Sequence, residues 1–299
     1  MLTFLENFSA LTWQMVVMWI IGGVLIFLAI KKEMEPSLLL PMGFGAILVN
    51  LPNSGAVEVL ETLYNAGISN ELFPLLLFIG IGAMIDFGPL LSNPKMLLFG
   101  AAAQFGIFFT LSAASLMGFD LHDAASIAII GAADGPTSIV VANYFKTKYL
   151  GAIVVAAYSY MALVPIVQPF CIKLITTKAE RQIRMKYNPS SVSKTTRILF
   201  PILVTAVAGL AAPASVALIG FLMFGNLLRE CGVLNSLSET AQKVLANLIT
   251  LFLGITVGVR MQAEYFLQPE TLMILALGLV ALCSIRLAAC CLPSCSTCS

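Results

Sequence analysis

Asp134 is the residue with the clearest capacity for chemistry in this sequence. It lies in the run Gly131-Ala-Ala-Asp134-Gly-Pro-Thr137, in the middle of a hydrophobic segment. A carboxylate inside the hydrocarbon layer is costly unless it is paired, hydrated or protonated, so such a residue is a functional candidate. Gly135 and Thr137 would add a freed backbone carbonyl and a hydroxyl, and oxygen ligands of these kinds suit a hard cation such as sodium.

The residues around Asp134 allow two interpretations of its role. Because desolvation favours the neutral form of a carboxylate, Asp134 could exchange a proton for a cation. The alternative is an aspartate that only caps the second half of a broken helix. The two roles are compatible, but a cap alone does not require a carboxylate at this depth.

Other polar side chains also fall within apolar segments. Tyr158 and Tyr160 lie in the segment after Asp134. A buried tyrosine hydroxyl usually finds a partner and could relay a proton, whereas packing or an interfacial position is the alternative. Asn93, Gln104 and Asn226 are possible supporting groups. Amides at such positions more often join helices or form turns than bind ions.

The composition is that of an integral membrane protein. Of the 299 residues, 59% are hydrophobic and 10% are charged, with a mean hydropathy of +0.96. A soluble domain has about 25% charged residues. The net charge of +1 gives no basic field for a nucleic acid partner. The sequence contains neither a nucleotide-binding G-x-x-x-x-G-K-[ST] loop nor a recognisable Ser-His-Asp or Cys-His set.

Apolar segments follow one another along most of the chain. A spanning helix needs about 20 mainly apolar residues. About ten segments approach this length, at 11–30, 38–51, 72–91, 96–117, 124–143, 150–175, 199–212, 214–228, 240–258 and 271–287. They predict an all-α polytopic membrane protein with one membrane domain over residues 1–282. The acidic stretch between the second and third segments, with Glu58 and Glu61, is expected to be a loop.

Loop charges indicate how the segments cross. Lys and Arg prefer the cytoplasmic side, so the basic loop 176–198 should be cytoplasmic. Regular crossing by every earlier segment would put this loop outside. The conflict disappears if segment 124–143 enters and leaves on the same side. Its central Gly and Pro residues break a helix, and bare backbone at membrane depth is tolerated where it lines a cavity or is buried in protein. The sequence therefore predicts a broken or re-entrant helix there.

A short internal repeat points to a transporter. Phe78-Ile-Gly80-Ile81 is followed by Pro94, and Phe252-Leu-Gly254-Ile255 is followed by Pro269, at an offset of about 175 residues. The predicted topology gives the two copies opposite directions. Inverted repeats with discontinuous helices are typical of secondary transporters, whose ion site lies near the midplane. The first repeat is assigned to about 11–175 and a partial second repeat to 199–282.

The end of the sequence departs from this repeat. The counterpart of Asp134 would fall near residue 309, so the second repeat is expected to be incomplete. Five of the seven cysteines lie in the last seventeen residues, namely Cys283, Cys290, Cys291, Cys295 and Cys298. We expect residues 283–299 to be a tail foreign to the fold, such as the product of a frame shift, and a redox or metal-binding tail is the alternative.

Four strings in the sequence resemble one protein family. They are Gly82-Ala-Met-Ile-Asp-Phe-Gly-Pro, Asn93-Pro-Lys-Met-Leu-Leu-Phe-Gly, Gly131-Ala-Ala-Asp-Gly-Pro-Thr and Ala157-Tyr-Ser-Tyr-Met-Ala-Leu-Val-Pro. The sequence is similar, over about residues 10–282, to the beta subunit of the biotin-dependent sodium-translocating decarboxylases, which act on oxaloacetate, methylmalonyl-CoA or glutaconyl-CoA. The family's later Asn-Pro-Leu-Ile-Gly and Gly-Pro-Asn motifs do not occur in this sequence.

The resemblance implies a decarboxylase sodium pump in the cell (inner) membrane. It implies that carboxybiotin arrives on a carboxyltransferase and biotin-carrier alpha subunit, that its decarboxylation consumes a proton, and that sodium is exported. A small gamma or delta subunit and further copies of the chain are the other implied partners. Asp134 matches the family's sodium- and proton-binding aspartate, and Tyr160 matches a residue of the coupling step. A biotin-independent sodium/proton antiporter or solute carrier, and an inactive truncated member, are the alternatives.

Overall fold

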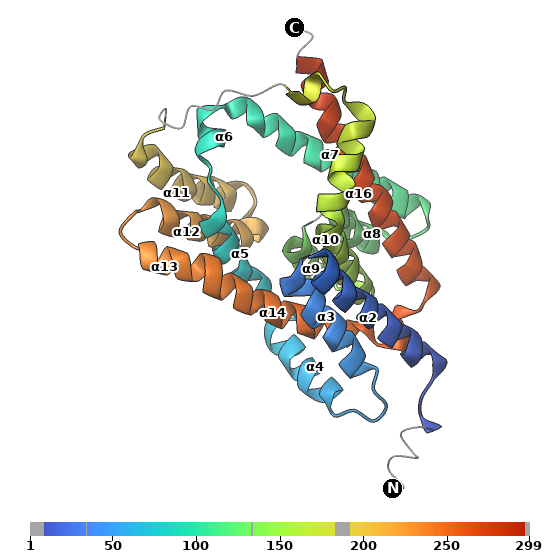
Figure 1. Ribbon diagram of the computed structural model, residues 1–299. Helices are drawn as coiled ribbons and strands as arrows, with labels where there is room; N and C mark the ends of the chain where they lie inside the picture. The colour runs from blue at the N-terminus through green and yellow to red at the C-terminus, as the bar shows by residue number, and fades with distance from the viewer. Residues whose placement is uncertain (1–8, 34, 133, 183–191, 297–299) are drawn as a thin grey trace.

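The molecule is built from helices. The computed structural model describes residues 9–33, 35–132, 134–182 and 192–296, of which 285–296 are described through their backbone only. No β-strand occurs within these ranges. The predicted all-α fold class is therefore confirmed. Figure 1 shows α7, α10 and α16 on one side and α11 to α13 on the other, with α14 running between them.

The ten predicted apolar segments all fall on helices. In chain order the helices are α2 (Trp13–Lys32), α3 (Pro36–Val49), α4 (Ala56–Gly67), α5 (Leu72–Met84), α6 (Gly88–Ser92), α7 (Leu97–Leu116), α8 (Leu121–Ala128), α9 (Gly135–Tyr144), α10 (Leu150–Ile175), α11 (Lys194–Ala211), α12 (Val216–Glu230), α13 (Asn235–Glu239), α14 (Ala246–Val257), α15 (Ala263–Phe266) and α16 (Pro269–Ser296). Short 3₁₀ turns continue some of these helices, among them η2 (Ile129–Ala132) after α8 and η7 (Gly258–Met261) after α14.

Several of the predicted segments form helices of spanning length. Among the described residues, three helical stretches are long and apolar enough to cross a membrane, namely Trp13–Lys32, Lys194–Ala211 and Asn235–Met261. The pair α4 and α5, bent by 61° between its halves, would be a fourth. α7, α10 and α16 have 20, 26 and 28 residues, and part of the side chains of each lie outside the described residues. Between α5 and α6 the chain leaves the helix at Ile85, and Pro89 lies in the first turn of α6.

One expectation about a loop was wrong. The acidic stretch after α3 is the helix α4, not a loop. Leu60 and Tyr64 lie one turn apart and are buried, while Glu58 and Glu61 are exposed. This spacing buries one face of a short amphipathic helix and leaves its charges outside. Apolar content alone did not indicate it, because half of the helix is polar.

The repeat predicted from sequence has a counterpart in the helix contacts. α3 packs on α14, and α12 packs on α5. Asn50, which follows α3, donates from Nδ2 to the Met261 carbonyl at 2.8 Å and accepts from the Ala263 N–H at 2.8 Å, at the break after η7. Asn226, near the end of α12, donates to the Ile85 carbonyl at 2.9 Å, at the break after α5. Thus α3 corresponds to α12, and α14 corresponds to α5.

The two copies run in opposite directions. Near the start of α5, the ring of Phe73 stacks on that of Phe252 in the second half of α14, at 5.7 Å between centroids. Nearer the end of α5, Gly80 packs against Ala246, the first residue of α14. The inverted arrangement inferred from the two Phe-Ile/Leu-Gly-Ile strings therefore has a direct basis in the fold.

Glycine allows the closest of these contacts. A Cβ on Gly82 of α5 would lie 1.8 Å from the carbonyl oxygen of Leu222 in α12. The opposing Gly225 is equally constrained, since its Cβ would lie 2.0 Å from the carbonyl oxygen of Ile79. Small residues are the usual means by which helix backbones approach in membrane proteins.

We expect Gly82→Ala to destabilise the protein by about 2 kcal/mol, because the added methyl forces two backbones apart. Gly23→Ala is the matched control, since a Cβ there has no neighbour within 4 Å. The measurement is the midpoint of thermal unfolding of each purified variant in detergent. Equal midpoints for the two variants would show that α5 and α12 do not pack as described.

Candidate functional site

The segment around Asp134 is a hairpin of two half-helices. α8 and η2 lead inward to Ala132, and α9 leads back from Gly135. The two outer ends meet, since Thr147 Oγ1 donates to Asp123 Oδ1 at 2.5 Å and the rings of His122 and Phe145 lie 5.3 Å apart. The predicted broken helix is confirmed, and it returns to the end of the molecule from which it came.

Asp134 is the N-cap of α9. Its backbone is extended, with φ −116° and ψ 98°, which turns the chain between the half-helices. Oδ1 accepts from the Thr137 N–H at 3.3 Å, and Oδ2 accepts from Thr137 Oγ1 at 2.5 Å. The Asp134 carbonyl accepts from Ser138 Oγ at 2.8 Å. A carboxylate has about four lone-pair sites, so each oxygen keeps acceptor capacity beyond the cap.

The oxygens at this position suit a cation. The carboxylate, the carbonyl and the Thr137 hydroxyl belong to the same turn of chain, with Ser138 buried beside them. The N-terminal end of a helix carries partial positive charge, which interacts favourably with a capping side-chain oxygen. The cap that the structure shows therefore leaves room for an ion at Asp134, and the ion-binding role stays a prediction.

Neighbouring helices close tightly around the hairpin tip. A Cβ on Gly131 would lie 2.4 Å from the Gly106 carbonyl oxygen of α7. A Cβ on Gly135 would lie 2.5 Å from the ring of Tyr158 in α10. α7 and α10 thus hold the two sides of the tip through glycine contacts, which explains why the motif needs glycine on both sides of Asp134.

The two tyrosines of α10 face different neighbours. Tyr158 is 1% exposed and packs on Gly135, the residue next to Asp134. Tyr160 donates its hydroxyl to the Leu275 carbonyl of α16, and its ring lies against Gly278. The structure therefore brings Tyr158 to the segment of Asp134, while Tyr160 joins α10 to α16 behind the hairpin.

The three amides predicted as supporting groups lie elsewhere. Asn226 joins α12 to the end of α5. Asn93 ends α6, and Gln104 is exposed on α7. Asp86, at the end of α5, accepts from the Gly88 N–H at 2.8 Å and lies 3.9 Å from Arg229. These contacts hold helix ends together, and the supporting role of Asn226 stays a prediction.

Asn50 was not among the residues predicted from sequence. Its side chain is 2% exposed and makes three hydrogen bonds, including one of 2.7 Å to the Ala46 carbonyl. The signal that could have found it is the same as for Asn226, an amide near the end of an apolar segment. The tail cysteines Cys290, Cys291, Cys295 and Cys298 lie outside the residues whose side chains are described, and Cys283 is a free thiol in α16.

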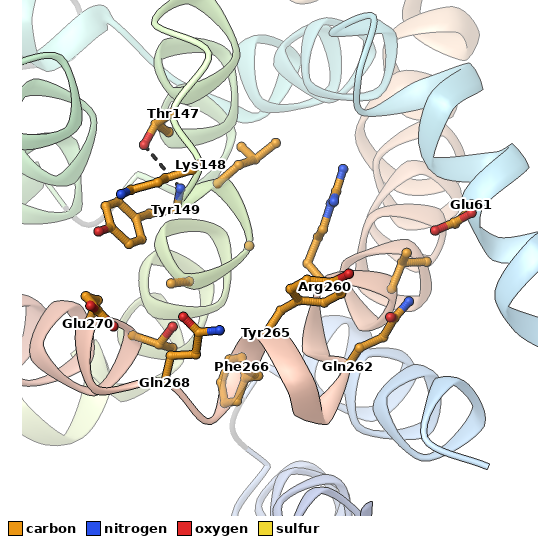
Figure 2. A pocket seen from close by; sticks show the side chains of 15 residues that line it. Glu61, Thr147, Lys148, Tyr149, Arg260, Gln262, Tyr265, Phe266, Gln268 and Glu270 are labelled. Atoms are coloured by element: carbon orange, nitrogen blue, oxygen red, sulfur yellow. Dashed lines mark hydrogen bonds between the residues drawn. The ribbon is translucent and has the colours of Figure 1, made fainter. Parts of the chain in front are cut away.

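A polar hollow of about 600 Å³ opens at the mouth of the hairpin. Thr147, which joins the two ends of the hairpin, forms part of its wall. Figure 2 shows Lys148 and Glu270 on one side of this hollow and Arg260 and Glu61 on the other. The hollow gives the hairpin end of the molecule a water-accessible surface with charges of both signs.

Comparison with known proteins agrees with this architecture. Residues 14–293 match the family described as "Na+-transporting oxaloacetate decarboxylase beta subunit". The chain is 49% identical to the methylmalonyl-CoA decarboxylase subunit beta of Veillonella parvula, over 92% of this chain and 74% of that protein. It is 49% identical to the glutaconyl-CoA decarboxylase subunit beta of Acidaminococcus fermentans, with the same coverage. It is 42% identical to the oxaloacetate decarboxylase beta chain of Klebsiella pneumoniae, over 89% of this chain and 76% of that protein.

The match spans both the hairpin of Asp134 and the paired helices of the repeat, and the relatives of all three substrate types share it. This all-helical membrane protein belongs to the family of sodium-transporting decarboxylase beta subunits.

Proposed function

We propose that this chain couples the decarboxylation of carboxybiotin, carried by a partner subunit, to the export of sodium, and that Asp134 holds sodium and a proton in turn. The observation that carries the proposal is the N-cap geometry of Asp134 at the tip of a hairpin enclosed by α7 and α10. The family membership supports the cargo and the reaction class.

The chemistry at Asp134 follows from its surroundings. An ionised carboxylate at membrane depth is stabilised by a bound cation or by protonation, so sodium and a proton compete for it. Gly135 and Thr137 are the other proposed ligands, through a backbone carbonyl and a hydroxyl. Decarboxylation of carboxybiotin consumes a proton and supplies the free energy for sodium export. Export of one charge against 100 mV costs about 2.3 kcal/mol, so release of sodium must be coupled to protonation of Asp134.

We assign Tyr160 to the coupling rather than to the ion. Its hydroxyl donates to the Leu275 carbonyl, and with Ile130 of the hairpin it belongs to one apolar cluster. Tyr160 would therefore transmit a shift of α16 against α10 to the hairpin. This makes Tyr160 a positioning residue, which transmits movement without touching sodium.

The charged residues at the two ends of the molecule support one orientation of the chain in the membrane. Arg197 lies 3.8 Å from Glu230, and Arg229 lies 3.9 Å from Asp86, so the basic start of α11 lies at the end where α5 finishes. Lys and Arg prefer the cytoplasmic side. The opposite end carries the hairpin mouth, with Asp123, and the hollow. We therefore place the hollow outside the cytoplasm, with the chain crossing the inner membrane several times.

The proposed assembly contains a carboxyltransferase and biotin-carrier alpha subunit and a small gamma or delta membrane subunit, and the chain itself could associate with further copies. The test is sodium uptake into proteoliposomes that hold the chain with its co-purified partners. We expect uptake that requires the decarboxylation substrate and stops when avidin binds the biotin group. Sodium movement that continues with avidin, driven by a proton gradient alone, would instead identify a biotin-independent sodium/proton antiporter.

A further inference from the structure

Tyr158 has a buried hydroxyl that no role described so far explains. In the part of the chain that the structure describes, the hydroxyls of Tyr158 and Tyr64 are the buried side-chain polar atoms without a hydrogen-bond partner. A buried hydroxyl that loses water without gaining a partner costs free energy. Tyr158 is also among the largest fully buried side chains, so its hydroxyl cannot turn to solvent without repacking.

The position of Tyr158 points to a ligand rather than to packing. Its ring is held against Gly135, the residue next to Asp134. Tyr160 shows the contrast, because its hydroxyl is satisfied by a carbonyl of α16. The two residues are about 200° apart around α10, since a helix turns by about 100° per residue. Only one of them can face the hairpin in this way.

We propose that the Tyr158 hydroxyl is a ligand of the sodium ion at Asp134. In the loaded site its oxygen contacts sodium as a neutral donor beside the carboxylate. This inference rests on the proposed function, because it needs sodium to bind at Asp134.

Tyr64 supplies a matched control. Its hydroxyl is also buried and without a partner, but its ring lies under the Arg260 guanidinium, 4.3 Å from the ring centroid. Tyr64 is in α4, and its neighbour Arg260 lines the hollow at the mouth of the hairpin rather than the tip that holds Asp134. Tyr64→Phe and Tyr158→Phe thus each remove one buried hydroxyl, and of the two rings only that of Tyr158 packs on the residue next to Asp134.

The experiment measures protection of Asp134 by sodium in the purified full chain. A hydrophobic carbodiimide labels the carboxylate, peptide mass spectrometry gives the labelling rate, and choline replaces sodium at constant ionic strength. We expect Tyr158→Phe to raise the sodium concentration for half-protection about tenfold, while Tyr64→Phe changes it less than about twofold. Tyr158→Phe should also reduce the rise in melting temperature that sodium gives to the wild type, because that rise reports binding to the folded state.

The possible outcomes separate the two proposals. If sodium protects the wild type and Tyr158→Phe equally, the inference about Tyr158 is wrong and the sodium site at Asp134 stands. If sodium protects neither the wild type nor any variant, the proposed function fails and the inference fails with it. A folding defect in Tyr158→Phe would lower its melting temperature in choline. Loss of a hydroxyl that has no hydrogen-bond partner predicts no such decrease.

Discussion

Replacing Asp134 with asparagine should abolish sodium-dependent decarboxylation and sodium transport by the assembled complex. Asparagine preserves the N-cap of α9, because its side-chain oxygen can still accept from the Thr137 N–H. It removes the negative charge that attracts sodium and the group that takes up a proton. We expect at least a hundredfold loss of sodium-stimulated activity, equivalent to about 2.7 kcal/mol or more. The measurement is the decarboxylation rate as a function of sodium concentration.

Asp86→Asn is the control for this result. Asp86 is also an aspartate at a break between helices, and it also caps its neighbour, through the Gly88 N–H. Its carboxylate lies near Arg229 at the end of α5 and away from the hairpin. We expect the variant to keep the sodium dependence of the wild type. If Asp134→Asn retained full sodium activation, the carboxylate at the hairpin tip would not be the ion-binding group.

Replacing Asn50 with leucine should destabilise the protein more than Gly82→Ala does. The buried amide bonds to three backbone groups and joins α3 to the break after η7. Leucine would leave the Met261 carbonyl and the Ala263 N–H without partners in a dry interior. Because each such group costs about 1–3 kcal/mol, we expect a loss of about 3 kcal/mol.

The control for Asn50 is Asn247→Leu. Asn247 is exposed on α14, so its replacement by leucine removes no buried hydrogen bond. The two variants are compared by thermal unfolding in detergent at one fixed sodium concentration. A melting temperature of Asn50→Leu equal to that of Asn247→Leu would mean that the contact of α3 with the end of α14 does not depend on this amide.

The broken helix could be predicted because its cause is local. Gly135 and Pro136 cannot continue a helix through Asp134, and the basic loop after α10 required a segment that returns to its own side. The structure shows both the break and the return, since Thr147 meets Asp123. The helix α4 was missed because its apolar face is too narrow to raise the overall hydropathy of that stretch.

The partners of individual side chains could not be predicted in the same way. The spacing of Tyr158 and Tyr160 places them on different faces of α10, but only the packing of α9 and α16 decides which tyrosine faces Asp134. Asn226 and Asn50 likewise bond to backbone more than a hundred residues away in the chain. Such contacts depend on how the two repeats meet, which no local pattern in the sequence contains.

Direct binding of sodium-22 to the purified chain tests the role of Asp134 most simply, because it needs neither partner subunits nor biotin. The wild type and Asp134→Asn are compared by equilibrium dialysis in detergent, across a range of sodium concentrations. We predict saturable binding by the wild type and none by the variant. Saturable binding of equal affinity in both proteins would contradict the proposed sodium site, since the ion would then bind without the carboxylate at the hairpin tip.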